Sequence, residues 1–143
     1  MPAAPPAKTP AQSPATTPFA LIGGERAVRA IVNRFYDLVE HDPAFAALRA
    51  LHATDLAPVR HGLERFLTGW LGGPRDWFDR GICIMSMHRA FPITPAVAQE
   101  WADAMARAVA QQDGLDPEIG ALMVDKLTGM AHAMINLGVS ARA

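Results

Sequence analysis

The sequence predicts an all-helical domain that follows an N-terminal tail. Apolar residues recur at three- and four-residue spacing in four long stretches, and no stretch of strand length alternates between apolar and polar residues. Proline or glycine bounds these stretches, as expected of helix ends. Half of the 143 residues are apolar and 19% are charged, which fits one compact domain. The fold class is therefore all-α.

The tail covers residues 1–18. It holds six of the twelve prolines, placed between Ala, Thr, Ser and Gln, and offers almost nothing that a core could bury. Such a composition is typical of a disordered extension with polyproline character. We expect a solvated tail rather than a docking segment, and a folded domain over residues 19–143.

The first long helix is predicted from Glu25 to about His41, because Gly23-Gly24 precedes it and Pro43 prevents its continuation. A short helix from Ala44 to about Ala50 follows. The apolar stripe of the long helix consists of Val28, Ile31, Val32, Phe35, Leu38 and Val39.

The next helix is predicted to begin near Asp55, a good N-cap, and to tolerate Pro58 in its first turn. Gly72-Gly73-Pro74 ends it sharply. Its buried stripe consists of Leu56, Val59, Leu63, Phe66, Leu67 and Trp70.

Residues 75–91 are expected to be irregular, apart from a turn or two of helix that leads into His88. Thr94-Pro95 then begins a helix to about Gln112, and Asp116-Pro117 begins the last helix, which is predicted to run until Gly138. The two stripes are Val97, Trp101, Met105 and Val109, and Ile119, Met123, Leu127, Met130, Met134 and Leu137.

The composition argues against several partners. The chain has thirteen Lys and Arg residues and fourteen Asp and Glu residues. The resulting net charge of −1 gives no attraction to nucleic acid or to an anionic membrane. No apolar run approaches the length of a membrane span, and no secretory signal is visible, so we expect a cytoplasmic protein. Cys83 is the only cysteine, which excludes an internal disulfide and a CxxC zinc site.

His88 is the candidate metal ligand. A neutral imidazole is the commonest protein ligand for a metal, and a single one on a short segment suits a flat cofactor, such as haem, that supplies the equatorial ligands itself. The alternative is an ordinary histidine on the surface or in the core. Cys83 as a thiolate ligand is a further alternative, and Met85 and Met87 are expected to be packing residues.

Six segments, taken in order, resemble the truncated haemoglobins of group II, the O type. The resemblance covers about residues 19–138 and rests on the joint order and spacing of these segments. They are Ile22-Gly23-Gly24-Glu25, Arg34-Phe35-Tyr36, Leu48-Arg49-Ala50-Leu51-His52, Phe66-Leu67-Thr68-Gly69-Trp70-Leu71-Gly72-Gly73-Pro74, His88 with Phe91-Pro92-Ile93, and Trp101.

The resemblance implies a globin fold of helices packed two over two around haem b, with His88 as the proximal iron ligand. It places Tyr36, Trp101 and His52 on the distal face, where hydrogen-bond donors stabilise the partial negative charge of bound O₂. It further assigns to the haem environment Val59, Leu63, Phe66, Arg89 and Phe91.

Some assignments have alternatives. Tyr36 and Trp101 could be large core aromatics without ligand contact, and His52 could face solvent, as we expect of His41, His61 and His132.

The chain also departs from the family pattern. Ser86-Met87 stand before His88 where the family commonly has a basic residue that pairs with a haem propionate. Arg89 is a candidate substitute for that residue, and the apolar segment 81–88 is shorter than the usual pattern.

The resemblance implies a haem protein that reversibly binds O₂, CO, NO or another small diatomic ligand. One alternative is a haem enzyme that consumes peroxide or converts bound O₂ and nitric oxide to nitrate. It would need a separate reductase, because the chain carries no flavin or nicotinamide motif. Another is a helical interaction module without haem, whose methionine-rich surfaces bind a partner. The sequence does not distinguish a monomer from a homodimer.

Overall fold

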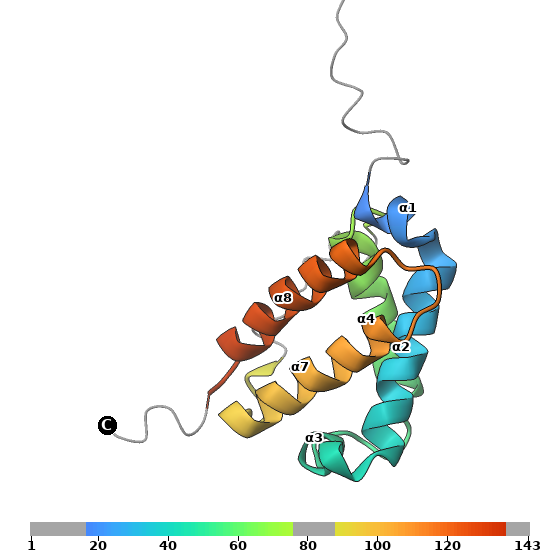
Figure 1. Cartoon of the computed structure of the whole chain (residues 1–143). Helices are drawn as coiled ribbons and strands as arrows, with labels where there is room; N and C mark the ends of the chain where they lie inside the picture. Colours follow the sequence, from blue (N-terminus) through green and yellow to red (C-terminus); the bar gives the residue numbers. More distant parts are fainter. Residues whose placement is uncertain (1–16, 76–87, 137–143) are drawn as a thin grey trace, which may run out of the picture.

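The computed structural model describes residues 17–75 and 88–136, and every regular element within these ranges is helical (Figure 1). The all-helical prediction is confirmed there. None of the helices in the described ranges is long and apolar enough to cross a membrane. The elements are α1 (Pro18–Ile22), α2 (Gly24–His41), the 3-10 turn η3 (Pro43–Phe45), α3 (Ala46–Ala50), α4 (Ala57–Trp70), α7 (Pro95–Ala110) and α8 (Pro117–Ala133).

Two helix pairs form the body of the molecule. α2 packs with α4, α7 packs with α8 in an antiparallel pair, and α2 also lies against α7, which joins the pairs into a two-over-two arrangement (Figure 1). Within the described residues the predicted apolar stripes face inward, because burying them removes apolar surface from water. The largest fully buried side chains are Phe35, Phe45, Ile31, Leu67, Met105, Leu127, Val28, Val32 and Val39.

The short helix α1 was not predicted, and it begins at Pro18, the last residue that the sequence assigned to the tail. The Thr17 hydroxyl caps it by accepting the Ala20 N–H at 3.1 Å, and Pro18 occupies its first turn. The Phe19 N–H donates to the Leu71 carbonyl at 2.9 Å, which fastens α1 to the end of α4. A Cβ at Gly73 would lie 2.9 Å from the Phe19 ring, so this contact requires glycine. Residues 1–16 lie outside the described ranges.

The helix starts follow the predicted capping signals closely. Thr94 accepts the Val97 N–H at 3.1 Å, and Asp116 accepts the Glu118 N–H at 2.9 Å. Asp55 accepts the Ala57 N–H at 3.0 Å, although α4 itself begins two residues later than its predicted cap.

The predicted end of the last helix was wrong. α8 stops at Ala133 rather than continuing to Gly138, because the backbone of Asn136 leaves the helix to pair with Ile93. The Asn136 N–H donates to the Ile93 carbonyl at 2.9 Å, so the chain after α8 returns to the segment before α7. In Figure 1 the red end of α8 accordingly lies near the yellow start of α7.

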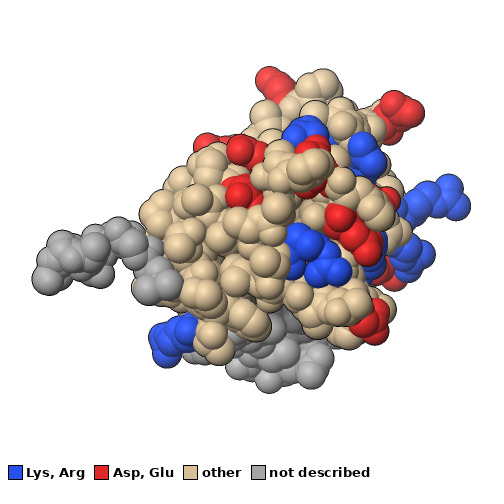
Figure 2. All heavy atoms as spheres, turned by 90° about the horizontal axis from the view of Figure 1, so that it is seen from below, with Lys and Arg blue, Asp and Glu red and all other residues tan. Residues whose placement is uncertain are grey.

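Charged side chains of both signs are interspersed on the face shown in Figure 2. This distribution agrees with the net charge of −1 and gives no one-sided basic patch on that face. The histidines at positions 41, 61 and 132 are exposed, as predicted.

Candidate functional site

An aromatic cluster joins the two helix pairs and contains both predicted distal aromatics. Phe35 and Tyr36 lie side by side on α2, with ring centroids 4.8 Å apart and planes at 86°. Trp101 on α7 packs against Phe35 at 5.3 Å. The structure therefore brings Tyr36 and Trp101 to one region of the core, around the fully buried Phe35.

The Tyr36 hydroxyl is the most informative atom of this cluster. Tyr36 is only 5% exposed, yet within the described ranges its hydroxyl makes no hydrogen bond. Burial raises the pKa of the phenol above its ordinary value, and the nearby Arg60 guanidinium partly opposes that rise, so the group stays protonated. A buried donor without a partner costs about 1–3 kcal/mol. Natural proteins keep such a group where a ligand, ion or water supplies the partner.

Trp101 resembles Tyr36 in this respect. Its side chain is partly buried against the core, and the indole N–H has no hydrogen-bond partner in residues 17–75 and 88–136. Two donors on separate helices thus share one region of the core without internal acceptors.

His52 lies in the corner after α3 and is partly buried rather than facing solvent. Its ring meets the Tyr36 ring edge to face at 5.8 Å, and its Nδ1 lies 3.0 Å from the Leu48 carbonyl oxygen. Burial lowers the pKa of His52, the Leu48 carbonyl opposes this, and the charges of Arg49 and His88 lower the pKa further. His52 and His88 are therefore within electrostatic range of each other.

The Leu48 carbonyl also determines which nitrogen of His52 carries the proton. A carbonyl oxygen only accepts, so Nδ1 is the protonated nitrogen, and Nε2 of the neutral ring bears a lone pair. In this tautomer the Nε2 atom of His52 is an acceptor.

The corner that carries His52 is itself held from two sides. Glu100, which precedes Trp101 on α7, accepts the Leu48 N–H at 2.9 Å. Arg49 donates to the carbonyls of Ala53 and Thr54 at 3.0 and 3.2 Å, and to that of His52 at 3.5 Å. These bonds fix the backbone from which the His52 ring projects.

The proximal candidate, His88, is half-buried and opens the second described range. Its carbonyl accepts the Phe91 N–H at 3.1 Å, and the chain then turns toward α7. Asn136 holds this segment: its Oδ1 accepts the Ile93 N–H at 2.9 Å and its Nδ2 donates to the Phe91 carbonyl at 2.9 Å. Sequence reasoning missed Asn136, because a lone asparagine near the end of a predicted helix has no distinctive spacing.

The remaining predicted site residues divide into two groups. On α4, Val59 and Leu63 are half-buried, and Phe66 is buried with its ring nearly parallel to that of Trp70 at 6.5 Å. Arg89 and Phe91 are exposed, Phe91 by 45%. The predictions for Cys83, Met85, Met87 and the shortened segment 81–88 fall outside the described residues, except at His88.

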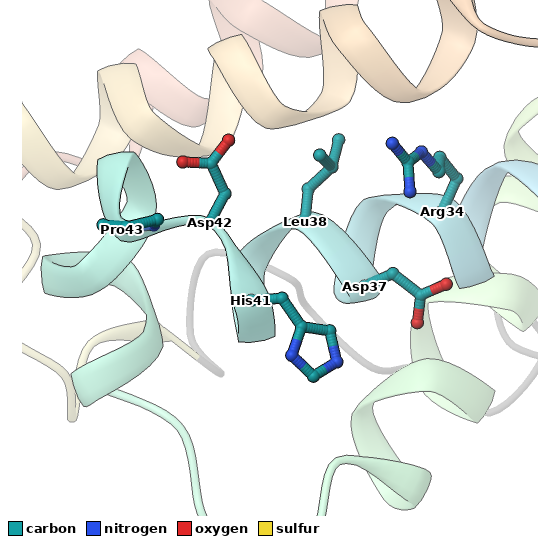
Figure 3. Close-up of a pocket in the computed structure, with 6 residues that line it drawn as sticks. All are labelled: Arg34, Asp37, Leu38, His41, Asp42 and Pro43. Carbon is teal, nitrogen blue, oxygen red and sulfur yellow. The ribbon is translucent and has the colours of Figure 1, made fainter.

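A separate concavity of about 620 Å³ opens on the surface beside the second half of α2 (Figure 3). Arg34 and Leu38 on α2, and Asp42 directly after its end, point toward α7, whereas Asp37 points toward α4. Arg34 donates to Gln111, and Asp42 accepts from Arg107 at 2.9 Å. These bonds join α2 to the end of α7 and account for much of the polar lining.

A family model described as "Bacterial-like globin" matches residues 17–136. The chain therefore belongs to the bacterial-like globin family, and within it to the truncated haemoglobins of group II. It is 30% identical over 115 residues to "Group 2 truncated hemoglobin YjbI" of Bacillus subtilis, which covers 79% of this chain and 84% of that protein.

Solved structures give the same result. The cold-adapted truncated haemoglobin of Pseudoalteromonas haloplanktis is 28% identical with a TM-score of 0.81, over 86% of this chain and 100% of that one. The group II 2-on-2 haemoglobin of Agrobacterium tumefaciens is 31% identical with a TM-score of 0.81, over 85% and 95%. The predicted two-over-two globin fold is thus confirmed.

The globin family implies haem, and the described residues fit it. The half-buried imidazole of His88 is a group that can bind iron, and the Tyr36 hydroxyl, which has no partner in the described residues, is a group that can donate to a small ligand. The exposed ring of Phe91, three residues after His88, supplies apolar surface of the kind that a porphyrin covers.

Replacing Asn136 by alanine is expected to accelerate haem loss, because it removes both side-chain bonds that hold the segment after His88. At about 1 kcal/mol per bond, the loss is expected to be faster by an order of magnitude. Transfer of haem to an excess of a haem-free globin measures this rate. Gln112→Ala is the matched control, because the Gln112 side chain bonds only the Ala108 carbonyl at the nearby end of α7. Equal rates of haem loss in both variants would show that the Asn136 side chain does not help to hold the segment after His88.

Proposed function

We propose that this chain is a haem b protein that reversibly binds O₂ and other diatomic ligands. His88 would hold the iron, and Tyr36 and Trp101 would donate hydrogen bonds to the bound diatomic ligand. The family supports haem and small-ligand binding in general. The assignment of residues is our own inference from their positions in the structure.

The observation that carries this proposal is the buried hydroxyl of Tyr36, which has no hydrogen-bond partner among the described residues. Phenylalanine would fill the same space without the cost of burying a lone hydroxyl, so the oxygen at this position needs a role outside the packing. A polar diatomic ligand that enters the core beside Tyr36 supplies the missing acceptor. The Bacillus subtilis neighbour described as an "oxygen-avid" truncated haemoglobin is consistent with such a donor set.

Each residue then has a distinct task. The haem would supply the iron site at which a diatomic ligand binds. His88 holds the iron through one ring nitrogen, and Asn136 keeps the following backbone in place. Tyr36 and Trp101 donate to the ligand, and both delay its departure. The His52 ring, fixed by the bond between its Nδ1 and the Leu48 carbonyl, packs edge to face on the Tyr36 ring and helps to hold that ring in place.

An absorption spectrum of the purified full chain tests the proposal, recorded as isolated and after addition of haemin, dithionite and CO. We expect a sharp Soret band that moves on reduction and again on addition of CO. A chain that stays colourless and takes up no haemin would contradict it and favour the helical interaction module. The enzymatic alternative, the separate reductase and the cytoplasmic location stay predictions.

A further inference from the structure

Arg60 lies against the outer side of the Tyr36 ring. Arg60 belongs to the first turns of α4, next to Val59, and its guanidinium carbon lies 5.7 Å from the centroid of the Tyr36 ring. Its side chain is 26% exposed, so one side meets solvent and the other meets the buried phenol. This separation is within the range in which a cation is attracted to the face of an aromatic ring.

Three hydrogen bonds fix the guanidinium in this position. Nη1 donates to the carbonyl oxygen of Asn33 at 3.3 Å and to its side-chain Oδ1 at 3.2 Å, and Nη2 donates to Asp37 Oδ1 at 3.1 Å. Figure 3 shows the Asp37 carboxylate on the side of α2 that faces α4. Asn33 and Asp37 stand one turn apart on α2, on either side of Tyr36 in sequence, so the bonds span the position from which the phenol projects.

A cation fixed at this place has a direct effect on a phenol. Positive charge at the ring draws electron density from the oxygen and makes the O–H a stronger donor. The Asp37 carboxylate, and Glu40 at 3.9 Å, offset part of that charge, but both lie toward solvent, with side chains 49% and 38% exposed. The Tyr36 ring faces the guanidinium itself. The direction of the effect on the pKa of Tyr36 agrees with this contact, because burial raises that pKa and the charge of Arg60 lowers it.

We propose that Arg60 is a positioning residue for Tyr36: fixed on Asn33 and Asp37, it holds the phenol ring and strengthens its hydroxyl as a hydrogen-bond donor. The consequence for ligand release rests on the function proposed above, whereas the contact itself does not. Arg60 acts on the phenol from its partly exposed side, through the face of the Tyr36 ring.

Tyr36 is the only tyrosine in the chain, which makes the contact directly measurable. Growth on 3,5-difluorotyrosine labels position 36 alone, and the fluorines bring the ionisation of the phenol into an accessible pH range. The ¹⁹F resonance of the full chain, reduced and saturated with CO where haem is present, then reports the pKa of this group. We expect Arg60→Gln to raise that pKa by about half a unit, and Arg60→Lys, which keeps the charge, to lie between Arg60→Gln and the wild type.

Arg29→Gln is the matched control. Arg29 also joins α2 to α4, through Glu64 at 3.2 Å, but it has no contact with Tyr36. We expect this variant to leave the ¹⁹F titration unchanged. Equal shifts in both variants, or no shift in Arg60→Gln, would overturn the proposal. Either result would mean that Arg60 serves only to join two helices, as Arg29 does.

The rate of O₂ dissociation tests the functional consequence. We expect Arg60→Gln to accelerate it about threefold and Arg29→Gln to leave it unchanged. A shifted pKa with an unchanged rate would overturn the claim that Arg60 strengthens the donor toward the ligand. If the chain binds no haem, the function proposed above is wrong. The ¹⁹F titration alone would then show whether Arg60 lowers the pKa of Tyr36.

Discussion

Replacing His88 by alanine is expected to abolish stable haem retention. A protein with a single axial histidine loses its only covalent hold on the cofactor when the imidazole is removed, and apolar contacts alone retain haem weakly. The haem content of the purified variant, measured by the ratio of Soret to protein absorbance, checks this. We expect a decrease of at least tenfold relative to the wild type.

His61→Ala is the matched control for this variant, because His61 is an exposed histidine on α4. It is expected to retain haem normally. Free imidazole added to His88→Gly is expected to restore a five-coordinate ferrous spectrum, since the small ligand can occupy the space left by the side chain. Normal haem content and unchanged spectra in His88→Ala would reject His88 as the axial ligand.

Replacing Tyr36 or Trp101 by phenylalanine is expected to accelerate O₂ dissociation by about tenfold or more, if each lost hydrogen bond contributes roughly 1.5 kcal/mol. Each change removes a donor and keeps an aromatic ring in the cluster around Phe35. Stopped-flow displacement of O₂ by CO measures the rate. Trp70→Phe repeats the tryptophan change at the end of α4, where the ring packs on Phe66, and is expected to leave the rate near the wild-type value.

Thermal unfolding separates a ligand role of Tyr36 from a packing role. Because the hydroxyl has no partner in the described residues, Tyr36→Phe is expected to leave the free energy of unfolding unchanged or to raise it by up to about 1–2 kcal/mol. Faster O₂ release together with undiminished stability would assign the hydroxyl to the ligand. Loss of stability with an unchanged dissociation rate would make Tyr36 an ordinary core aromatic.

The helices with broad apolar stripes could be predicted from the sequence because burial and local preference agree there. The stripe that contains Phe35 and Leu38 forms α2, and Thr94 caps α7 as its residue type predicts. α1 was missed because a helix of five residues has no period to detect, and its stability comes from the Phe19–Leu71 contact across the chain. The end of α8 was misplaced because Asn136 pairs with residues more than forty positions away.

In the candidate site, too, some residues could be predicted from the sequence, whereas contacts between separate helices could not. Tyr36 and Trp101 were singled out because their segments match a family pattern, and the structure places both beside Phe35. The acceptor role of His52 depends on one backbone carbonyl, and the Arg60 contact depends on how α4 crosses α2. No residue spacing encodes such contacts, since they arise from the packing of separate helices.

The infrared stretching band of CO on the reduced protein, compared between the wild type and Tyr36→Phe, tests the central claim most directly. The claim is that the buried Tyr36 hydroxyl donates to a ligand held opposite His88. A donor that points at bound CO polarises the molecule and lowers its stretching frequency, so the band is expected to move to higher frequency when the hydroxyl is removed. A band at the same frequency in both proteins would contradict the claim and place the Tyr36 hydroxyl away from the ligand.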